Sequence, residues 1–201
     1  MACTALTSGR GLDCNRVSGG VKYVYFAVFD QVLSTTEGTG ADKGSITEIS
    51  MATAPSAASL YRYTVPRGST TASEAITGST ENGTIFYTPT VSMVLNKLTK
   101  EDQNEIRLLG QTQVMVFCQM NAQLPTGTDT IICMGRQNAM SMNAGTADTG
   151  AAFGDRNGYT LTFDGLEAEP FLMVKDYPLL TGPFSDSGLG GIAIPIISTP
   201  Q

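Results

Sequence analysis

Short runs of alternating apolar and polar residues, bounded by glycine, proline or asparagine, constrain the fold of this chain more than any other feature. In the run YTLTFDGLE, Tyr159, Leu161 and Phe163 fall on one face of a strand and threonines fall on the other. Comparable runs rich in Val, Ile and aromatic residues predict about eight to ten strands. They lie at residues 21–29, 46–51, 60–65, 73–79, 84–95, 112–121, 130–137, 139–143, 159–167 and 168–174. Strands separated by turns, with little helix, predict a mainly β chain folded as an antiparallel β-sandwich or barrel-like domain.

The stretch VLNKLTKEDQNEIRLLGQ interrupts this pattern with a helical one. Thr99 is a suitable N-cap, acidic residues follow it in the first turn, and Gly110 suits the C′ position after the last turn. Ile106 and Leu109 lie three residues apart and therefore share a face. We expect one short α-helix at about 99–109, with these two residues packed on the sandwich and its charges facing outward.

The chain is expected to form a single domain over residues 1–201, because neither an internal repeat nor a linker divides it. Residues 1–20 are small, polar and Gly-rich and predict an N-terminal arm, while residues 178–201 predict a C-terminal arm. The β core then spans 21–177. Within it, residues 30–59 resemble a long loop with one weak strand, and loops of that length usually have a function.

Composition narrows the function before any motif is considered. Only 15% of residues are charged, against about 25% in typical domains, which favours a surface largely covered by other subunits. The net charge of −6 argues against tight binding of nucleic-acid phosphates or of an anionic membrane surface. No run approaches the roughly 18 apolar residues of a membrane span, and the N-terminus lacks the apolar segment of a signal peptide. We therefore expect a protein that is neither exported nor membrane-bound.

Histidine is absent, which removes the commonest general base, the commonest metal ligand and every Ser-His or Cys-His pair. The four cysteines, Cys3, Cys14, Cys118 and Cys133, include no Cys-x-x-Cys pair, which argues against a structural zinc site. Cys118 and Cys133 lie in apolar runs that could pair as a hairpin. We interpret them as buried free thiols that pack as small apolar side chains, in a protein made in a reducing compartment.

Two Gly-rich segments superficially suggest a ligand site. SGGVK and GTADTGAAFGDRNG both lack the Gly-Lys-Ser/Thr ending of a phosphate-binding loop, so a loop or an assembly contact is favoured. Asp155 and Asn157 could be taken for calcium ligands, but the further carboxylates of such a loop are missing. Asn157-Gly158 instead predicts a turn that leads into a strand.

The charged helix also invites a chemical interpretation. Glu101 and Glu105 share a face at i, i+4, yet their position beside Lys100 favours a solvated surface or a salt bridge between subunits over paired catalytic carboxylates. Methionines at strand spacing favour core packing over soft-metal binding. The sequence therefore predicts no catalytic, cofactor-binding or metal-binding residues, no cofactor and no enzymatic activity.

The order of the elements resembles that of a known family. Long arms and a long early loop precede extended strands, the single helix and further strands, in the stretches ENGTIFYTPTVSMVLNKLTKEDQNEIRLLGQTQVMVF and GAAFGDRNGYTLTFDGLEAEP. From about Val21 to Val174, the chain resembles the tail tube proteins of tailed bacteriophages. The resemblance implies a structural virion protein, made in the host cytoplasm, that forms hexameric rings stacked into a hollow tube for DNA ejection.

The resemblance also implies roles for particular segments. Edge strands would pair between neighbouring copies to close the ring, and residues 74–95 would contribute to the inner wall. Ring-to-ring contact would use residues 34–59 together with the terminal arms. Further partners would be sheath, tape measure, baseplate or terminator proteins. A negative lumen would let the genomic DNA pass without specific binding.

Three other functions compete with this interpretation. Another self-assembling virion protein, such as a head decoration or tail terminator protein, would form small rings or none where a tube protein forms long tubes. A carbohydrate-binding β-sandwich would favour exposed aromatic side chains, often the Trp that is absent here, and acidic calcium clusters. An enzyme would have to use carboxylate-only or Lys-based catalysis, because the sequence has no histidine and forms no nucleophile–base pair.

Overall fold

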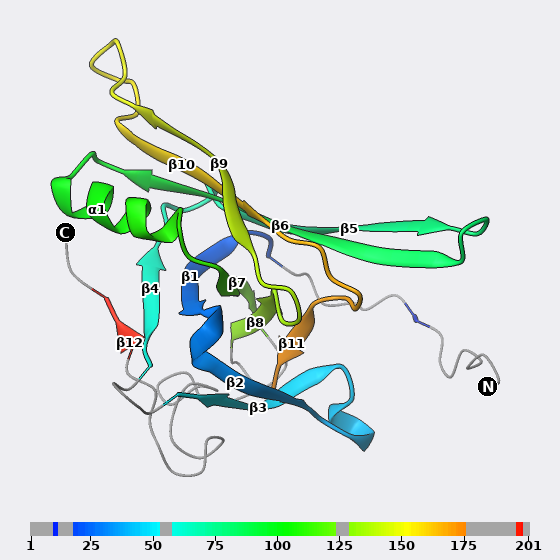
Figure 1. Cartoon of the computed structure of the whole chain (residues 1–201). Coiled ribbons are helices and arrows are strands. Elements are labelled where there is room, and N and C mark those ends of the chain that lie inside the picture. The colour runs from blue at the N-terminus through cyan, green and yellow to red at the C-terminus, as the bar shows by residue number, and fades with distance from the viewer. Residues whose placement is uncertain (1–9, 12–17, 53–57, 124–128, 176–195, 199–201) are drawn as a thin grey trace.

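The computed structural model describes residues 10–11, 18–52, 58–123, 129–175 and 196–198, and most of the two expected arms lies outside these residues. The described part is mainly β, with twelve strands in two sheets and a single α-helix (Figure 1). This confirms the predicted mainly β, sandwich-like fold with one helix. The structure has more strands than the eight to ten expected, because one segment expected to be a loop and one within the expected C-terminal arm also form strands.

The larger sheet, sheet A, has eight strands in the order β12-β4-β1-β7-β8-β11-β3-β2. Their bounds are β1 Val21–Val28, β2 Val32–Glu37, β3 Ser45–Met51, β4 Leu60–Thr64, β7 Val114–Gln123, β8 Asp129–Met134, β11 Leu172–Val174 and β12 Ile196–Ile197. The smaller sheet, sheet B, has the antiparallel order β5-β6-β10-β9. Its strands are β5 Thr71–Ser79, β6 Thr84–Asn96, β9 Ser141–Asp148 and β10 Gly158–Asp164.

The strand β1 of sheet A is buried on both faces, in keeping with its apolar sequence VKYVYFAV. Val24 and Phe26 point to one side of β1, while Tyr25 and Ala27 point to the other, and all four are buried. The first side meets sheet B in an inter-sheet core, where the rings of Phe26 and Phe163 lie 4.8 Å apart. The second side forms another core, which gathers residues from β4 and, across the sheet, from β3 and β11. Sheet A therefore curls around this second core.

The helix α1 spans Lys100–Leu109 and begins as predicted, since the Thr99 side chain accepts a hydrogen bond from Asp102 N at 3.1 Å. Ile106 and Leu109 pack against the inter-sheet core, which confirms the expected buried face. The role predicted for Gly110 is wrong: its φ of −68° is right-handed, whereas a C′ glycine is left-handed. Close packing is what limits this position, because a Cβ there would lie 3.1 Å from the Met142 Cε atom.

Residues 30–59 are not a long loop. They contain the short 3-10 helices η1 (Phe29–Gln31) and η2 (Gly40–Asp42) and the antiparallel strands β2 and β3. Three side chains of β3, those of Ile46, Ile49 and Met51, are buried in the second core. The local sequence predicts β3 only as a weak strand, because its burial depends on parallel pairing with β11, more than 120 residues away. Only the end of this hairpin, residues 37–45, retains the character of a connecting loop.

The Gly-rich loop expected after residue 143 is likewise shorter than predicted, because β9 continues to Asp148. Small residues are tolerated there because β9 packs closely on β10: a Cβ on Gly145 would lie 3.2 Å from the Leu161 Cδ2 atom. Asn82-Gly83, a pair typical of tight turns, lies in the turn between β5 and β6, with Gly83 at a φ of +62°.

The two described cysteines are buried free thiols, as predicted. They lie on the neighbouring strands β7 and β8, with Cys118 opposite Ile132 and Cys133 opposite Phe117. Cys118 belongs to the inter-sheet core and Cys133 to the second core, so their side chains point to opposite faces of sheet A. Burial raises the pKa of the Cys118 thiol to about 12 and also raises the pKa of Cys133, which keeps both thiols protonated.

Candidate assembly surface on the four-stranded sheet

The two edges of sheet B have little of the usual protection of exposed strand edges, apart from one register shift in the pairing of β9 with β10. β5 and β9 are its outermost strands, nine and eight residues long. Neither contains a lysine or a proline, and their only charged residues are Glu74 and Asp148. Residues 143–148 of β9 are all exposed. Strands with these properties readily pair with another chain.

The direction of the strands fits such pairing between copies. Every neighbouring pair in sheet B is antiparallel, so β5 and β9, at the two ends of four strands, run in opposite directions. If β5 of one copy is placed beside β9 of the next, the new pair is antiparallel as well. Sheet B can therefore continue from copy to copy without a change in its hydrogen-bonding pattern.

Hydrogen bonds within the sheet show which main-chain groups are free at the two edges. The main chains of Tyr87 and Glu167 form two hydrogen bonds, each with an N–O distance of 2.8 Å. Tyr87 is an odd-numbered residue of β6, and the odd-numbered residues of that strand therefore form their main-chain hydrogen bonds with the β10 side. Bonding direction alternates along each strand. The even-numbered residues of β5, such as Ile76, therefore direct their N–H and C=O groups outward. On β9 the odd-numbered residues Gly145 and Ala147 do so.

The outer face of sheet B, which points away from sheet A, carries mainly hydroxyl and small apolar side chains. Alternation and register place on it Thr71, Ser73, Ala75, Thr77, Thr84, Phe86, Thr88, Thr90, Ser92, Val94, Ala144, Thr146, Asp148, Thr160, Thr162 and Asp164. The strand positions of this face include two carboxylates and no lysine or arginine. Arg156 reaches it from the adjoining loop and donates to Thr160 Oγ1 at 2.8 Å.

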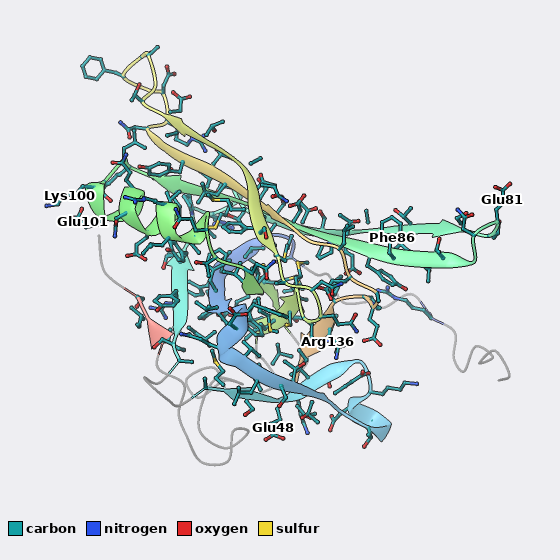
Figure 2. The ribbon with its side chains drawn as sticks, viewed as in Figure 1. Glu48, Glu81, Phe86, Lys100, Glu101 and Arg136 are labelled. Atoms are coloured by element: carbon teal, nitrogen blue, oxygen red, sulfur yellow. The ribbon has the colours of Figure 1, made fainter. Side chains whose placement is uncertain are left out.

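The β5–β6 hairpin projects beyond the body of the molecule (Figure 1), and Figure 2 shows Glu81 at its tip and Phe86 along its shaft. On the face that continues from the inter-sheet core, Ile76 is 67% exposed and Ile85 is 58% exposed. Sheet A does not extend far enough to cover them. Among the residues that the structure describes, none buries these apolar side chains of the hairpin.

A buried carboxylate braces the base of this hairpin. Glu167 is 5% exposed, and its two carboxylate oxygens accept hydrogen bonds from Gln137 N at 2.9 Å and Asn138 N at 3.0 Å. Its main chain pairs with Tyr87 of β6. Glu167 thus ties the turn after β8 to the point where the hairpin leaves the body.

Glu74 adds a second tie at the same place. Its Oε1 atom accepts a hydrogen bond from Phe171 N at 2.9 Å. Burial raises the pKa of the Glu74 carboxyl, and the nearby charge of Glu167 raises it further, while the Phe171 bond acts in the opposite direction. Sequence analysis missed both glutamates, because their partners lie about 30 and 97 residues away and no local motif marks them.

Replacement of Glu167 by Gln is expected to lower the free energy of unfolding by about 2 kcal/mol. The amide keeps one acceptor oxygen but turns an N–H₂ group toward a main-chain N–H, so a charge-assisted bond is lost. Urea unfolding of the purified variant measures the change. Glu169→Gln is the matched control, since Glu169 is exposed and pairs with Arg136 at the surface, where loss of a pair costs less than about 1 kcal/mol. Equal stability of the two variants would contradict the bracing role.

The residues that had suggested chemistry occupy exposed or turn positions. Glu101 and Glu105 lie on the exposed side of α1, and Lys100 Nζ lies 3.4 Å from Glu101 Oε1 (Figure 2). Asp155 Oδ2 accepts from Ala151 N and Ala152 N within the loop before β10. The turn predicted at Asn157-Gly158 does not form at that pair, because Gly158 is already the first residue of β10. Asn157 Oδ1 accepts a hydrogen bond from Leu98 N, so this side chain holds the loop before β10 against the turn after β6. The structure does not bring these groups together.

Across the described residues, no group of three or more Cys, Asp or Glu side chains is arranged to hold a metal ion. The same part of the chain contains no helix with the length and apolar character required to cross a membrane. Comparisons with family models, curated proteins and solved structures find no match to this chain.

Proposed function

We propose that this chain is a structural subunit that pairs edge to edge with its own copies into rings, which stack into a hollow tube like the tail tube of a tailed bacteriophage. The observation that carries the proposal is the pair of free edges of sheet B. They are similar in length, contain no lysine or proline and run in opposite directions, so one copy can follow another.

Pairing of β5 with β9 is a head-to-tail contact, and such contacts form a closed ring when the rotation per copy closes. Closure satisfies every free edge, which removes the aggregation hazard of the isolated subunit. Six copies, the number that the resemblance implies, would close a barrel of about 24 strands. Barrels of 16 to 18 strands already leave an aqueous channel, so a barrel of this size would be open along its axis.

The outer face of sheet B is the natural lining of that channel, because its other face packs on sheet A. The lining would then be rich in hydroxyl groups, with Asp148 and Asp164 as its strand carboxylates. Phosphates of a passing DNA duplex would meet few cations and would not be held. The subunit would then act as a conduit in the virion with no specific contact to the genome.

Ring-to-ring contact is assigned to the end of the β2–β3 hairpin, residues 37–45, in place of the longer loop first expected. This segment carries Glu37, Asp42 and Lys43 on a protruding turn. The terminal arms, and contacts to sheath, tape measure, baseplate or terminator proteins, belong to the proposal through the resemblance alone.

Negative-stain electron microscopy of the purified protein tests the proposal. We expect long hollow tubes of uniform diameter, built from stacked rings. Single small rings would favour a terminator protein, and a protein that stays monomeric at high concentration would contradict edge pairing. A reconstruction of the tube with a lumen lined mainly by Lys and Arg would refute the assignment of the lining.

A further inference from the structure

The loop between β9 and β10, residues 149–157, is built by its own hydrogen bonds and presents a fully exposed aromatic side chain. Asp148 Oδ1 accepts from Gly150 N, and Asp155 Oδ2 accepts from two further main-chain N–H groups of the loop. Phe153, near the middle of this loop, is completely exposed. We call this segment the Phe153 loop.

The base of the Phe153 loop is anchored to the turn after β6. Lys97 N donates to Asn157 O at 2.7 Å, and Leu98 N donates to Asn157 Oδ1 at 3.1 Å. The loop is therefore held by polar contacts alone, and Phe153 adds nothing to its stability. A large apolar side chain held in solvent on a braced loop is the kind of residue that anchors an interface.

An apolar surface suited to receive it lies at the opposite end of the same sheet. Ile76 and Ile85 share one face of the β5–β6 hairpin, and the half-buried Tyr87 follows them toward the body. In Figure 1 the hairpin and the Phe153 loop point in opposite directions along sheet B. Two copies displaced along the strands would thus bring the loop of one against the hairpin of the other.

Charges at the two ends are complementary in the same arrangement. Glu81 lies at the hairpin tip, and Lys97 lies at the base of the Phe153 loop. Neither side chain forms an ion pair with any residue that the structure describes. The tip of the hairpin, Glu81, is four residues from Ile85 on its shaft, and the tip of the loop, Phe153, is four residues from Asn157 at its base. Each of these two distances is therefore at most about 14 Å, so the two projections have comparable lengths. When the hairpin of one copy and the Phe153 loop of another lie side by side and point in opposite directions, Glu81 comes to lie beside Lys97 and Phe153 beside Ile85.

We propose that the Phe153 loop of one copy docks on the β5–β6 hairpin of a copy in the adjacent ring, with Phe153 packed on Ile76 and Ile85 and Lys97 facing Glu81. This contact rests on the proposed function, since it requires stacked rings, and it adds a second axial contact beside residues 37–45. The partner is a second copy of this chain, because both surfaces expose apolar side chains and they carry opposite charges.

The first test compares Phe153→Ala with Leu108→Ala, which removes another exposed apolar side chain, from the helix. Assembly is followed by sedimentation and negative-stain microscopy over a range of protein concentrations. We expect Phe153→Ala to form rings but to need at least about tenfold more protein for tubes, as an anchor residue of an interface would. Leu108→Ala should assemble like the wild type.

A charge exchange tests the register of the contact. Glu81→Lys and Lys97→Glu should each weaken tube formation, and the double variant should recover it, because the double variant restores the pair with reversed signs. Both residues are exposed, and circular dichroism should show an unchanged fold for all three proteins. The two single variants change the net charge in opposite directions, so weaker tube formation in both cannot arise from a general effect on net charge.

The outcomes separate this inference from the proposed function. Tubes in the wild type together with undiminished tubes in Phe153→Ala would overturn the docking contact and leave the proposed function intact. Loss of rings in Phe153→Ala would place the contact within a ring and would overturn the axial assignment. A wild-type protein that never forms tubes would refute the proposed function itself.

Discussion

Replacement of Ala147 by proline is expected to abolish ring formation while the subunit stays folded. The N–H group of Ala147 points to the free edge of β9, so proline removes no hydrogen bond within sheet B. In a ring it removes a bond to β5 of the next copy and leaves a carbonyl unpaired, at a cost of about 3 kcal/mol per contact. The protein concentration needed for assembly should rise at least about 100-fold.

Two neighbouring substitutions make this experiment specific. Ala147→Val keeps the edge N–H group and should assemble as the wild type does. Thr146→Pro, one residue away, removes a group that bonds toward β10, so it should lower the stability of the subunit itself. Sedimentation measures assembly and thermal unfolding measures stability. Normal rings in Ala147→Pro would show that β9 is not the joining edge.

Phe163→Ala should produce the largest loss of stability, because this ring joins the two sheets. Phe163 is completely buried and lies 4.8 Å from Phe26 across the inter-sheet core. Truncation of a buried Phe to Ala costs about 3–5 kcal/mol, a large share of the 5–15 kcal/mol that typically separates folded from unfolded states. For a chain of this length the unfolding temperature should fall by roughly 10 °C or more.

Phe153→Ala is the matched control, since the same atoms are removed from a fully exposed position ten residues earlier. Its unfolding temperature should equal that of the wild type within about 1–2 °C. A small effect of Phe163→Ala would mean that sheet B can pack on sheet A without this ring. The inter-sheet core would then be less important for presenting the two edges than the structure indicates.

The braced hairpin and the free edges have a common consequence for the isolated subunit. An exposed edge strand is a site for uncontrolled pairing, and the apolar shaft of the hairpin adds to this hazard. If the proposed assembly is right, the isolated subunit is expected to aggregate at high concentration unless a partner covers these surfaces. The opposite directions of β5 and β9 favour pairing with further copies of the same chain as the way in which these edges are buried.

Much of the fold could be predicted from local sequence. The period-two runs identify β1, β4, β7, β8, β10 and β11, and Asn82-Gly83 identifies the β5–β6 turn. Thr99 marks the start of α1, since an N-cap acts through a residue three positions later. These features depend on neighbours in the chain, and for that reason the sequence displays them directly.

Other features depend on partners far away in the chain. β3 acquires its place in sheet A only beside β11, and Glu167 acquires its role only where the turn after β8 meets β6. Gly110 is explained by the position of Met142, which no local motif encodes. Each of these contacts joins segments more than 25 residues apart, and its energy arises from burial and hydrogen bonding in the folded chain.

The sequence by itself therefore determined a mainly β chain with one capped helix, few charges and no histidine. Only the tertiary structure decided which strands share a sheet, and hence that β5 and β9 are left as its two open edges. The physical reason is that alternation specifies which faces of a strand are buried, whereas its neighbours in the sheet are selected by the packing of the whole chain.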